Sequence, residues 1–249
     1  MTPDSPLVET CRPSPNHGER LKPLDALVLH YTGIPTGEAA LDLLCSPAAQ
    51  VSCHYLVWED GRIWQLVEES RRAWHAGKSF WAGETDMNSR SIGMEIVNPG
   101  HDGGLPPFPD AQIDAVSALC RDICARRGIK PERVLAHSDI APARKTDPGE
   151  VFPWERLAGI GHWIAPQPIL HGPVHDLGAK GPAVADLQVM LASYGYGVET
   201  SGVYDDATRI VVAAFQRHFR PEWVDGVADI STIETLRRLL EGLDPPAAS

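Results

Sequence analysis

The sequence lacks long hydrophobic runs and any excess of positive charge. No stretch approaches the roughly 20 apolar residues that a membrane-spanning helix requires. The formal net charge of −11 disfavours binding to phosphate-rich partners. We therefore expect no transmembrane segment and no nucleic-acid partner. An acidic protein can still act on a neutral sugar or peptide, so the charge excludes partners without naming one.

Cysteines are few, and secretion signals are missing. Five cysteines in 249 residues do not make the dense disulfide framework of a small secreted domain, which favours a reducing compartment. Residues 1–11 have neither the basic segment nor the apolar segment of a secretory signal peptide. We expect a cytoplasmic protein, with a periplasmic location as the alternative. We also expect a monomer.

A change in composition divides the chain into an α/β part and a purely helical part. Residues 1–20 are rich in proline and polar residues and are predicted to form a leader on the surface. Residues 21–165 alternate strand and helix patterns, residues 166–176 form a proline-containing linker, and residues 177–244 contain three short helical stripes. The predicted fold class is α/β, with a mixed central β-sheet flanked by helices, followed by a small three-helix domain.

Several local patterns are clear. An apolar run at 25–30 predicts a buried strand, and Asp-Gly at 60–61 between two β-prone runs predicts a hairpin. An apolar stripe predicts a helix over 109–127 that Gly128 ends. A further helix is expected at 154–160, and Ser231 is expected to cap the last helix of the chain.

Three metal-competent side chains follow strand-like segments. His30 ends the first apolar strand, His137 follows a short strand at 134–136, and Asp147 lies ten residues further on. A catalytic zinc ion needs three protein ligands and one open position, which a His₂Asp set can provide. Each residue also has a structural interpretation. A buried imidazole can bond a backbone carbonyl, and Asp147 before Pro-Gly is also a typical turn residue.

Two further charged residues can carry chemistry. Glu95 lies among apolar neighbours in a predicted strand, where desolvation would raise its pKa and suit it to general acid–base work. The alternative is an exposed position on an edge strand. Lys145 lies two residues before Asp147 and could place a cation near an oxyanion, although most lysines only solvate a loop.

Five motifs in order resemble one family. Residues 27–32, 52–57, 73–77, 92–98 and 136–149 look like those of the type-2 N-acetylmuramoyl-L-alanine amidases, which are zinc enzymes related to peptidoglycan recognition proteins. The resemblance covers residues 21–165. It implies Zn²⁺ on His30, His137 and Asp147, with Glu95 and Lys145 as catalytic partners. The residues expected to bind substrate are Tyr31, His54, Trp74, His75 and Asn98.

The tail resembles a second family. Residues 181–188, 202–208, 215–216 and 224–226 are similar to the three-helix peptidoglycan-binding domain often fused to cell-wall hydrolases. Together the two resemblances imply hydrolysis of the amide between N-acetylmuramic acid, or its anhydro form, and L-alanine. The substrate would be peptidoglycan or a muropeptide, in wall turnover or recycling.

Two other functions compete with this interpretation. The first is a non-catalytic peptidoglycan receptor, which the complete set of three ligands disfavours. The second is a cysteine peptidase that uses Cys53. Because Cys53 lies inside a predicted strand rather than at a helix N-terminus, its thiolate would not be stabilised, and this function is disfavoured.

Overall fold

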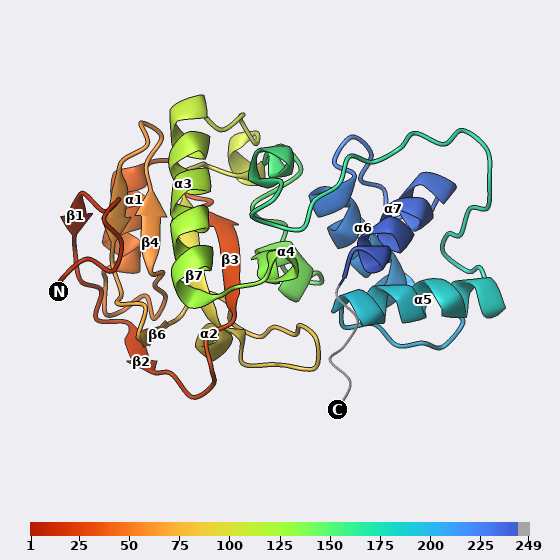
Figure 1. Ribbon diagram of the computed structural model, residues 1–249, viewed down its shortest axis with the longest axis horizontal. Coiled ribbons are helices and arrows are strands. Elements are labelled where there is room, and N and C mark those ends of the chain that lie inside the picture. The colour runs from red at the N-terminus through yellow and green to blue at the C-terminus, as the bar shows by residue number, and fades with distance from the viewer. Residues whose placement is uncertain (244–249) are drawn as a thin grey trace.

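A six-stranded mixed sheet forms the centre of the larger part of the molecule. The computed structural model describes residues 1–243, and the strand order is β1-β5-β4-β7-β3-β8 (Figure 1). β3, β4, β7 and β8 are parallel, whereas β5 pairs antiparallel with β4 as the predicted hairpin requires. The strands are β1 (Thr10–Cys11), β3 (Ala26–Tyr31), β4 (Tyr55–Val57), β5 (Ile63–Gln65), β7 (Ser91–Ile96) and β8 (Val134–Ala136). The predicted mixed sheet flanked by helices is confirmed.

The two central strands have different neighbours on their two faces. Side chains alternate along a strand, so Ala26, Val28 and His30 of β3 point to one face, and Leu27 and Leu29 point to the other. The first face packs in part against the C-terminal helices. The second face belongs to a separate apolar cluster.

One long helix covers the second face. α3 (Asp110–Arg127) lies across the sheet in Figure 1 and buries a stripe that includes Ile113, Val116 and Ile123. Gly128 ends the helix in a left-handed conformation with φ of 65°, which glycine adopts without steric cost. The predicted helix over 109–127 is confirmed.

The first face is covered by several short elements. These are α1 (Gly37–Leu44), α2 (Met87–Arg90), α4 (His137–Ile140) and the C-terminal helices. Neither α2 nor α4 was predicted from the sequence. Three 3₁₀ turns complete this part of the chain, at His101–Gly103, Pro131–Arg133 and Trp154–Leu157. The last of these is shorter than the helix expected at 154–160.

Three helices make up the C-terminal part, as predicted. They are α5 (Pro182–Tyr194), α6 (Asp206–Phe219) and α7 (Ile230–Glu241). The cap of α7 is Asp229, whose side chain accepts from the Thr232 amide, so the expected cap at Ser231 is wrong. Residue 244, the predicted end of this domain, lies outside the described residues.

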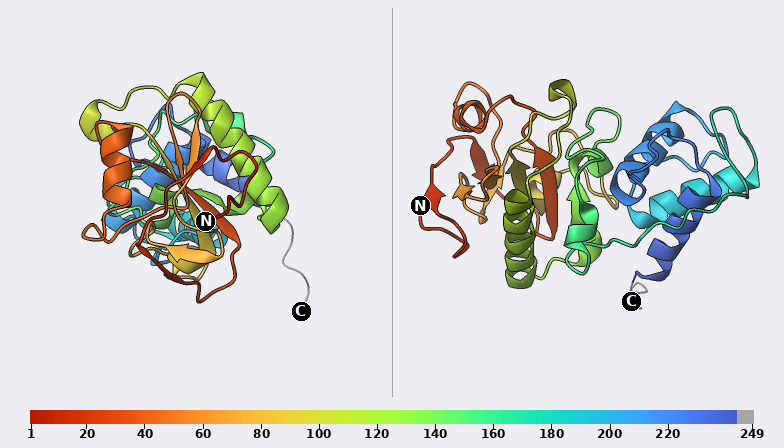
Figure 2. Two further views of the ribbon diagram at one scale, coloured as in Figure 1. Left: turned by 90° about the vertical axis from the view of Figure 1, so that its left-hand side faces the viewer. Right: turned by 90° about the horizontal axis from the view of Figure 1, so that it is seen from above.

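The apolar core crosses from the sheet into the C-terminal helices. Ala26 and Val28 of β3 share one buried cluster with Leu191 and Phe215. Trp81, in the loop between β6 (Arg71–Ala73) and α2, packs edge-on against tyrosines of the helical part. Figure 1 and the right-hand view of Figure 2 place α4 between the sheet and the C-terminal helices. The helical part therefore contacts the face of the sheet that carries His30.

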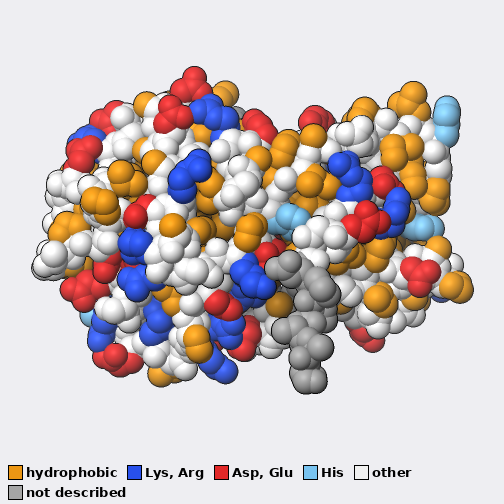
Figure 3. All heavy atoms as spheres, viewed as in Figure 1, with side chains coloured by type: hydrophobic (Ala, Val, Ile, Leu, Met, Phe, Trp, Pro, Cys, Tyr) orange, Lys and Arg blue, Asp and Glu red, His pale blue; other side chains and the backbone are white. Residues whose placement is uncertain are grey.

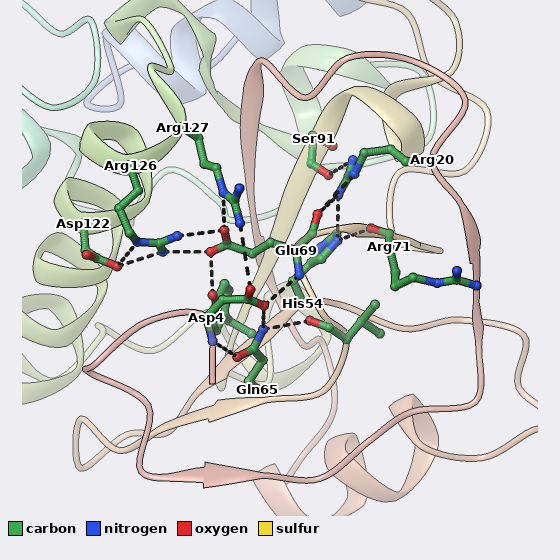
Figure 4. A network of polar contacts seen from close by, with 12 residues as sticks. Asp4, Arg20, His54, Gln65, Glu69, Arg71, Ser91, Asp122, Arg126 and Arg127 are labelled. Carbon is green, nitrogen blue, oxygen red and sulfur yellow. Dashed lines mark hydrogen bonds and ion pairs between the residues drawn. The ribbon is translucent and has the colours of Figure 1, made fainter. Parts of the chain in front are cut away.

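The N-terminal leader is built into the fold. It supplies β1 to the main sheet, and its β2 (His17–Glu19) pairs antiparallel with β6. Figure 4 shows Glu69 between two arginines of α3 and the N-terminal Asp4. Glu69 accepts from Arg126 at 2.8 and 2.9 Å and from Arg127 at 2.5 Å. Burial would raise the pKa of Glu69, but these partners and the Tyr55 hydroxyl lower it to about 2.

The surface has mixed charge. Lys and Arg side chains are interspersed with Asp and Glu across the face in Figure 3, which shows no broad basic patch. The formal net charge of the whole chain is −11. Among residues 1–243, no helix has both the length and the apolar composition needed to cross a bilayer.

Candidate metal centre and active site

Three predicted ligands meet at one edge of the sheet. His30 lies near the carboxyl end of β3, His137 begins α4 directly after β8, and Asp147 follows in the next loop. β3 and β8 are adjacent parallel strands, so their carboxyl ends lie side by side. All three side chains are buried. This topology, rather than sequence spacing, brings the residues together.

The three ligand atoms form a compact triangle. His30 Nδ1 and His137 Nδ1 are 2.9 Å apart, and each is 2.9 Å from Asp147 Oδ2. A single ion can contact all three atoms at the roughly 2.0–2.2 Å typical of zinc. Among the described residues, this set is the candidate group for holding a metal ion.

The ring nitrogens that point away from the triangle, Nε2 of His30 and of His137, each have a hydrogen-bond partner. His137 Nε2 lies 3.1 Å from the Ala76 carbonyl, which can only accept, so His137 carries its proton there and keeps the Nδ1 lone pair free. His30 Nε2 lies 3.0 Å from His75 Nδ1. His75 Nε2 in turn lies 3.3 Å from Ser91 Oγ, which donates to a backbone carbonyl. Such outer partners orient metal-binding histidines, so the donor set fits a metal ion.

The electrostatic environment keeps His30 neutral and Asp147 ionised. Burial and the neighbouring His137 lower the pKa of His30 to about 4, despite opposing contributions from Asp147. Burial would raise the pKa of Asp147, but His137 and His30 outweigh it and lower that pKa. Neutral imidazole and carboxylate are the forms that bind metal ions.

Glu95 lies beside this triangle with an unsatisfied oxygen. It pairs in register with His30 across β7 and β3, so both side chains point to the same face. Within residues 1–243, its Oε2 is buried and finds no hydrogen-bond partner. Burial, with the nearby Asp147 charge, raises the pKa of Glu95 well above its usual range. A carboxyl group with a raised pKa and a free oxygen is suited to proton transfer.

A cavity of about 370 Å³ opens over the triangle. This volume lies within the range of small-molecule sites. Its lining includes the three ligands together with Tyr31, Trp74, His75, Glu95 and Lys145. The apolar side chains of α1 form another part of the wall. The structure therefore brings eight of the ten predicted site residues to one cavity.

The other two predicted residues lie elsewhere. His54 is fully buried, and its ring contacts the Arg20 side chain, the Arg71 carbonyl and the Gly93 amide. Asn98 bonds the backbone of the following loop through Pro106 and Gly100. Neither lines the cavity. These contacts give both residues a supporting position and argue against direct contact with substrate.

Tyr31, at the end of β3, and Trp74, directly after β6, both line the cavity. The Tyr31 hydroxyl lies 3.0 Å from His101 Nδ1 and 3.1 Å from Thr146 Oγ1, so it joins two loops at the rim. The Trp74 ring is half-buried and lines the same space. Both residues can therefore reach a bound molecule.

Four supporting residues could not be found from the sequence. The Ala76 carbonyl accepts from the outer nitrogen of His137, and the Ser91 hydroxyl contacts Nε2 of His75, the partner of His30. A Cβ on Gly93 would lie 2.3–2.6 Å from ring atoms of His75, so only glycine leaves room for that ring. Arg144 donates to the Ala76 and Lys78 carbonyls at 2.6 and 2.8 Å and lines the cavity. Of these four residues, only Gly93 has a recognisable sequence signal, because a glycine inside a strand often marks a place where another group approaches the backbone closely.

The rival thiol chemistry has no support in the structure. Cys53 is fully buried and does not line the cavity. Burial and the neighbouring Glu95 raise the pKa of its thiol well above the usual range. A nucleophilic thiol needs the opposite shift and an accessible sulfur.

A buried His₂Asp triangle with an adjacent free carboxyl group, at the edge of a mixed sheet, is the architecture of a metal-dependent hydrolase. Comparison with known proteins then gives the family. Residues 20–150 match the family model described as "N-acetylmuramoyl-L-alanine amidase". Residues 180–236 match the model described as "Putative peptidoglycan binding domain".

Individual relatives agree with the family match. The N-acetylmuramoyl-L-alanine amidase AmiD of Escherichia coli is 42% identical over 236 residues, covering 88% of this chain and 83% of AmiD. The 1,6-anhydro-N-acetylmuramyl-L-alanine amidase AmpD of Enterobacter cloacae is 35% identical, covering 58% of this chain and 86% of AmpD. The solved complex of Escherichia coli AmiD with anhydro-N-acetylmuramic acid-L-Ala-D-gamma-Glu-L-Lys superposes with a TM-score of 0.76 at 41% identity, covering 92% of each chain.

The chain belongs to the N-acetylmuramoyl-L-alanine amidase family, and it is an enzyme.

Proposed function

We propose that this amidase hydrolyses the bond between the lactyl group of N-acetylmuramic acid, in its ordinary or anhydro form, and L-alanine. A single zinc ion would be held by His30, His137 and Asp147. The observation that carries the proposal is the 2.9 Å triangle of these three ligand atoms at the base of a cavity that also contains Glu95.

In this proposal, hydrogen bonds orient the three ligand side chains for metal binding. His75 and the Ala76 carbonyl hold the outer nitrogens of His30 and His137, so both Nδ1 atoms face Asp147. When bound, zinc supplies Lewis acidity that polarises the scissile carbonyl and lowers the pKa of the attacking water. The cavity leaves space on the open side of the triangle for both water and substrate.

Glu95 moves the proton in this proposal. Its free Oε2 takes a proton from the attacking water as the new carbon–oxygen bond forms. It then gives that proton to the amide nitrogen as the carbon–nitrogen bond breaks. The products are the muramyl carboxylic acid and a peptide with a free L-alanine amine. A raised pKa suits Glu95 to both halves of this transfer.

Lys145 and Trp74 contact the substrate in this proposal. Lys145 lines the cavity next to the ligand Asp147 and places a positive charge near the developing oxyanion. Trp74 offers a half-buried aromatic surface to the sugar. His75 also lines the cavity, and its contact with His30 Nε2 supports a further role in holding that ligand.

The helical part is proposed to bind polymeric wall. Its support is the match of residues 180–236 to a peptidoglycan-binding model. A second contact raises the effective concentration of a polymeric substrate at the active site. The rival function, a receptor without catalysis, has no comparable support, because the ligand triangle and the free Glu95 oxygen are both present.

Digestion with product masses tests the proposal. Purified protein would be incubated with intact sacculi and, separately, with soluble anhydro-muropeptides, each with and without a zinc chelator. We expect free peptides that begin with L-alanine, and their loss with the chelator. Products cut at a sugar linkage or at a peptide bond would contradict the assignment, as would binding to sacculi without any cleavage.

A further inference from the structure

The ligand His137 belongs to a helix of only four residues. α4 begins at His137, and its one turn closes through the bond from the Ala141 amide to the His137 carbonyl at 3.0 Å. The Ser138 amide donates to the Asp147 carbonyl at 3.0 Å, so the same turn also supports the third ligand. A single turn is not stable by itself and depends on tertiary contacts. The contacts that hold α4 therefore set the geometry of the ligand triangle.

Most of the hydrogen bonds that hold the Asp139 side chain of α4 come from the C-terminal part of the chain, from α6 and from the loop after α5. This side chain is fully buried and accepts three hydrogen bonds. One comes from the Ala136 amide at 2.8 Å, within the same turn. The other two come from the Tyr196 hydroxyl, to Oδ1 at 2.7 Å, and from His218 Nδ1, to Oδ2 at 2.7 Å. A buried carboxylate needs such partners, and two of its three donors belong to the helical part.

Both donors are fixed in place. The His218 ring stacks on Trp154, with centroids 3.6 Å apart and an interplanar angle of 23°. The Tyr196 ring packs edge-on against Trp81 at 4.9 Å. Burial, together with the Asp139 charge, raises the pKa of Tyr196 well above its usual range, so its hydroxyl stays protonated and donates. Because packing fixes both rings, the two donor atoms also fix the position of the Asp139 side chain.

We propose that Tyr196 and His218 are positioning residues of the metal centre. By holding Asp139, they fix α4 and thereby place His137 Nδ1 against His30 and Asp147. The helical part then has a second role besides wall binding, because it completes the support of the active site. This inference rests on the proposed function of the His30, His137 and Asp147 set as a zinc site.

Tyr196→Phe is the informative variant. It keeps the aromatic ring against Trp81 and removes only the hydroxyl that reaches Asp139. Outer partners of metal ligands typically contribute 10–100-fold to metal affinity or activity, and because Asp139 acts one step further away we expect about 10-fold loss in zinc affinity and in kcat. KM for a soluble muropeptide should stay within about twofold, because no substrate contact is changed.

His218 supplies an independent pair of variants. His218→Leu removes the donor to Asp139 Oδ2 and should lower zinc affinity to a similar extent. His218→Asn places an amide N–H near the position of Nδ1 and should restore most of the loss. A purely structural role would make these two variants alike, because both lose the stacking on Trp154.

Tyr194→Phe is the matched control. Tyr194 also packs against Trp81 between the two parts of the molecule, and its hydroxyl bonds His162 Nδ1 at 3.0 Å instead of reaching α4. This variant removes an interface hydroxyl without touching the metal centre. Its zinc affinity and kcat should equal those of the unmodified protein.

The experiment measures zinc dissociation constants by chelator competition on the full chain, with the Co²⁺ absorption spectrum as a report of ligand geometry. Weaker zinc binding and an altered Co²⁺ spectrum for Tyr196→Phe, with both unchanged for Tyr194→Phe, would support the inference. Equal zinc binding in the two tyrosine variants, while the unmodified protein binds zinc and cleaves substrate, would overturn the inference alone. An unmodified protein that binds no zinc would overturn the proposed function and the inference with it.

Discussion

The two faces of the central sheet are covered in different ways. On one face the long helix α3 packs over alternate side chains of β3 and β7, and Phe152, Trp154 and Leu157 join the same cluster. The other face is covered by several elements together: α1, α2, α4, the loop that carries Trp81, and the C-terminal helices. The proposed ligands and Glu95 lie on the face that carries His30, opposite α3. One face thus serves stability, and the other combines stability with chemistry.

This difference shows where changes can be tolerated. A helix of 18 residues with one apolar stripe is supported by many equivalent contacts. The site face depends on short elements whose positions rest on a few directed hydrogen bonds, such as those to His75 and Asp139. Substitutions on the α3 face should therefore change the free energy of unfolding, whereas substitutions on the site face should change metal binding and turnover.

The largest effect is expected from removing a ligand. His137→Ala deletes one corner of the triangle, so zinc content should fall toward zero and turnover by at least about 10³-fold, since Lewis-acid catalysis is worth several kcal/mol. Elemental analysis and a muropeptide assay on the same sample check this. His171→Ala, in the exposed linker, is the control and should change neither. Normal activity of His137→Ala would remove His137 from the site.

Glu95→Gln should separate chemistry from metal binding. The amide is nearly isosteric but cannot accept the proton, so zinc content should stay near that of the unmodified protein while kcat falls by roughly 10²–10⁴-fold. The exposed Glu155→Gln serves as control. Retained turnover would mean that another group is the base. Loss of zinc would instead make Glu95 a ligand or a support for one.

Gly93→Ala should disturb the site through His75. The added methyl group would lie within 2.6 Å of the imidazole ring, which must move and give up its bond to His30. We expect zinc affinity or kcat to fall by about 10–100-fold. Gly161→Ala adds a methyl group at ordinary contact distance, 3.5 Å from Val134, and should leave both quantities unchanged. If the two alanine variants behaved alike, His75 would have no positioning role.

The smallest effect on activity is expected on the α3 face. Leu119→Ala empties a buried position there and should lower the free energy of unfolding by about 2–5 kcal/mol while zinc affinity stays unchanged. Ile140→Ala makes a comparable cavity in α4 on the site face and should weaken zinc binding as well. Chemical denaturation and chelator competition on both variants test the contrast. Weakened zinc binding in Leu119→Ala alone would reverse the assignment of the two faces.

The sequence predicts the elements that depend on local pattern. The apolar run of β3, the hairpin of β4 and β5 around Gly61, and α3 with its glycine end are all confirmed, because each is encoded by neighbouring residues. The pairing of β2 with β6 and the single turn of α4 could not be predicted. The hydrogen bonds of β2 and β6 join residues far apart in the chain, and the four residues of α4 are too few to show a helical period.

The candidate site also has a part that the sequence predicts and a part that it does not. Residue types and family motifs indicated His30, His137, Asp147, Glu95 and Lys145, and the structure brings all five to one cavity. Which residues surround them could not be read from the sequence. His54 carries the same chemical group as His75, yet only the fold shows that one supports β7 through the Gly93 amide and the other contacts a ligand.

Zinc titration of the metal-free protein tests the central claim most directly. Protein stripped by a chelator would be assayed on anhydro-muropeptide after stepwise addition of zinc, with bound metal measured at each step. We predict no turnover at the start and a linear rise that ends at about one zinc per chain, as for a mononuclear site. Full turnover in protein shown to contain no metal would contradict the account.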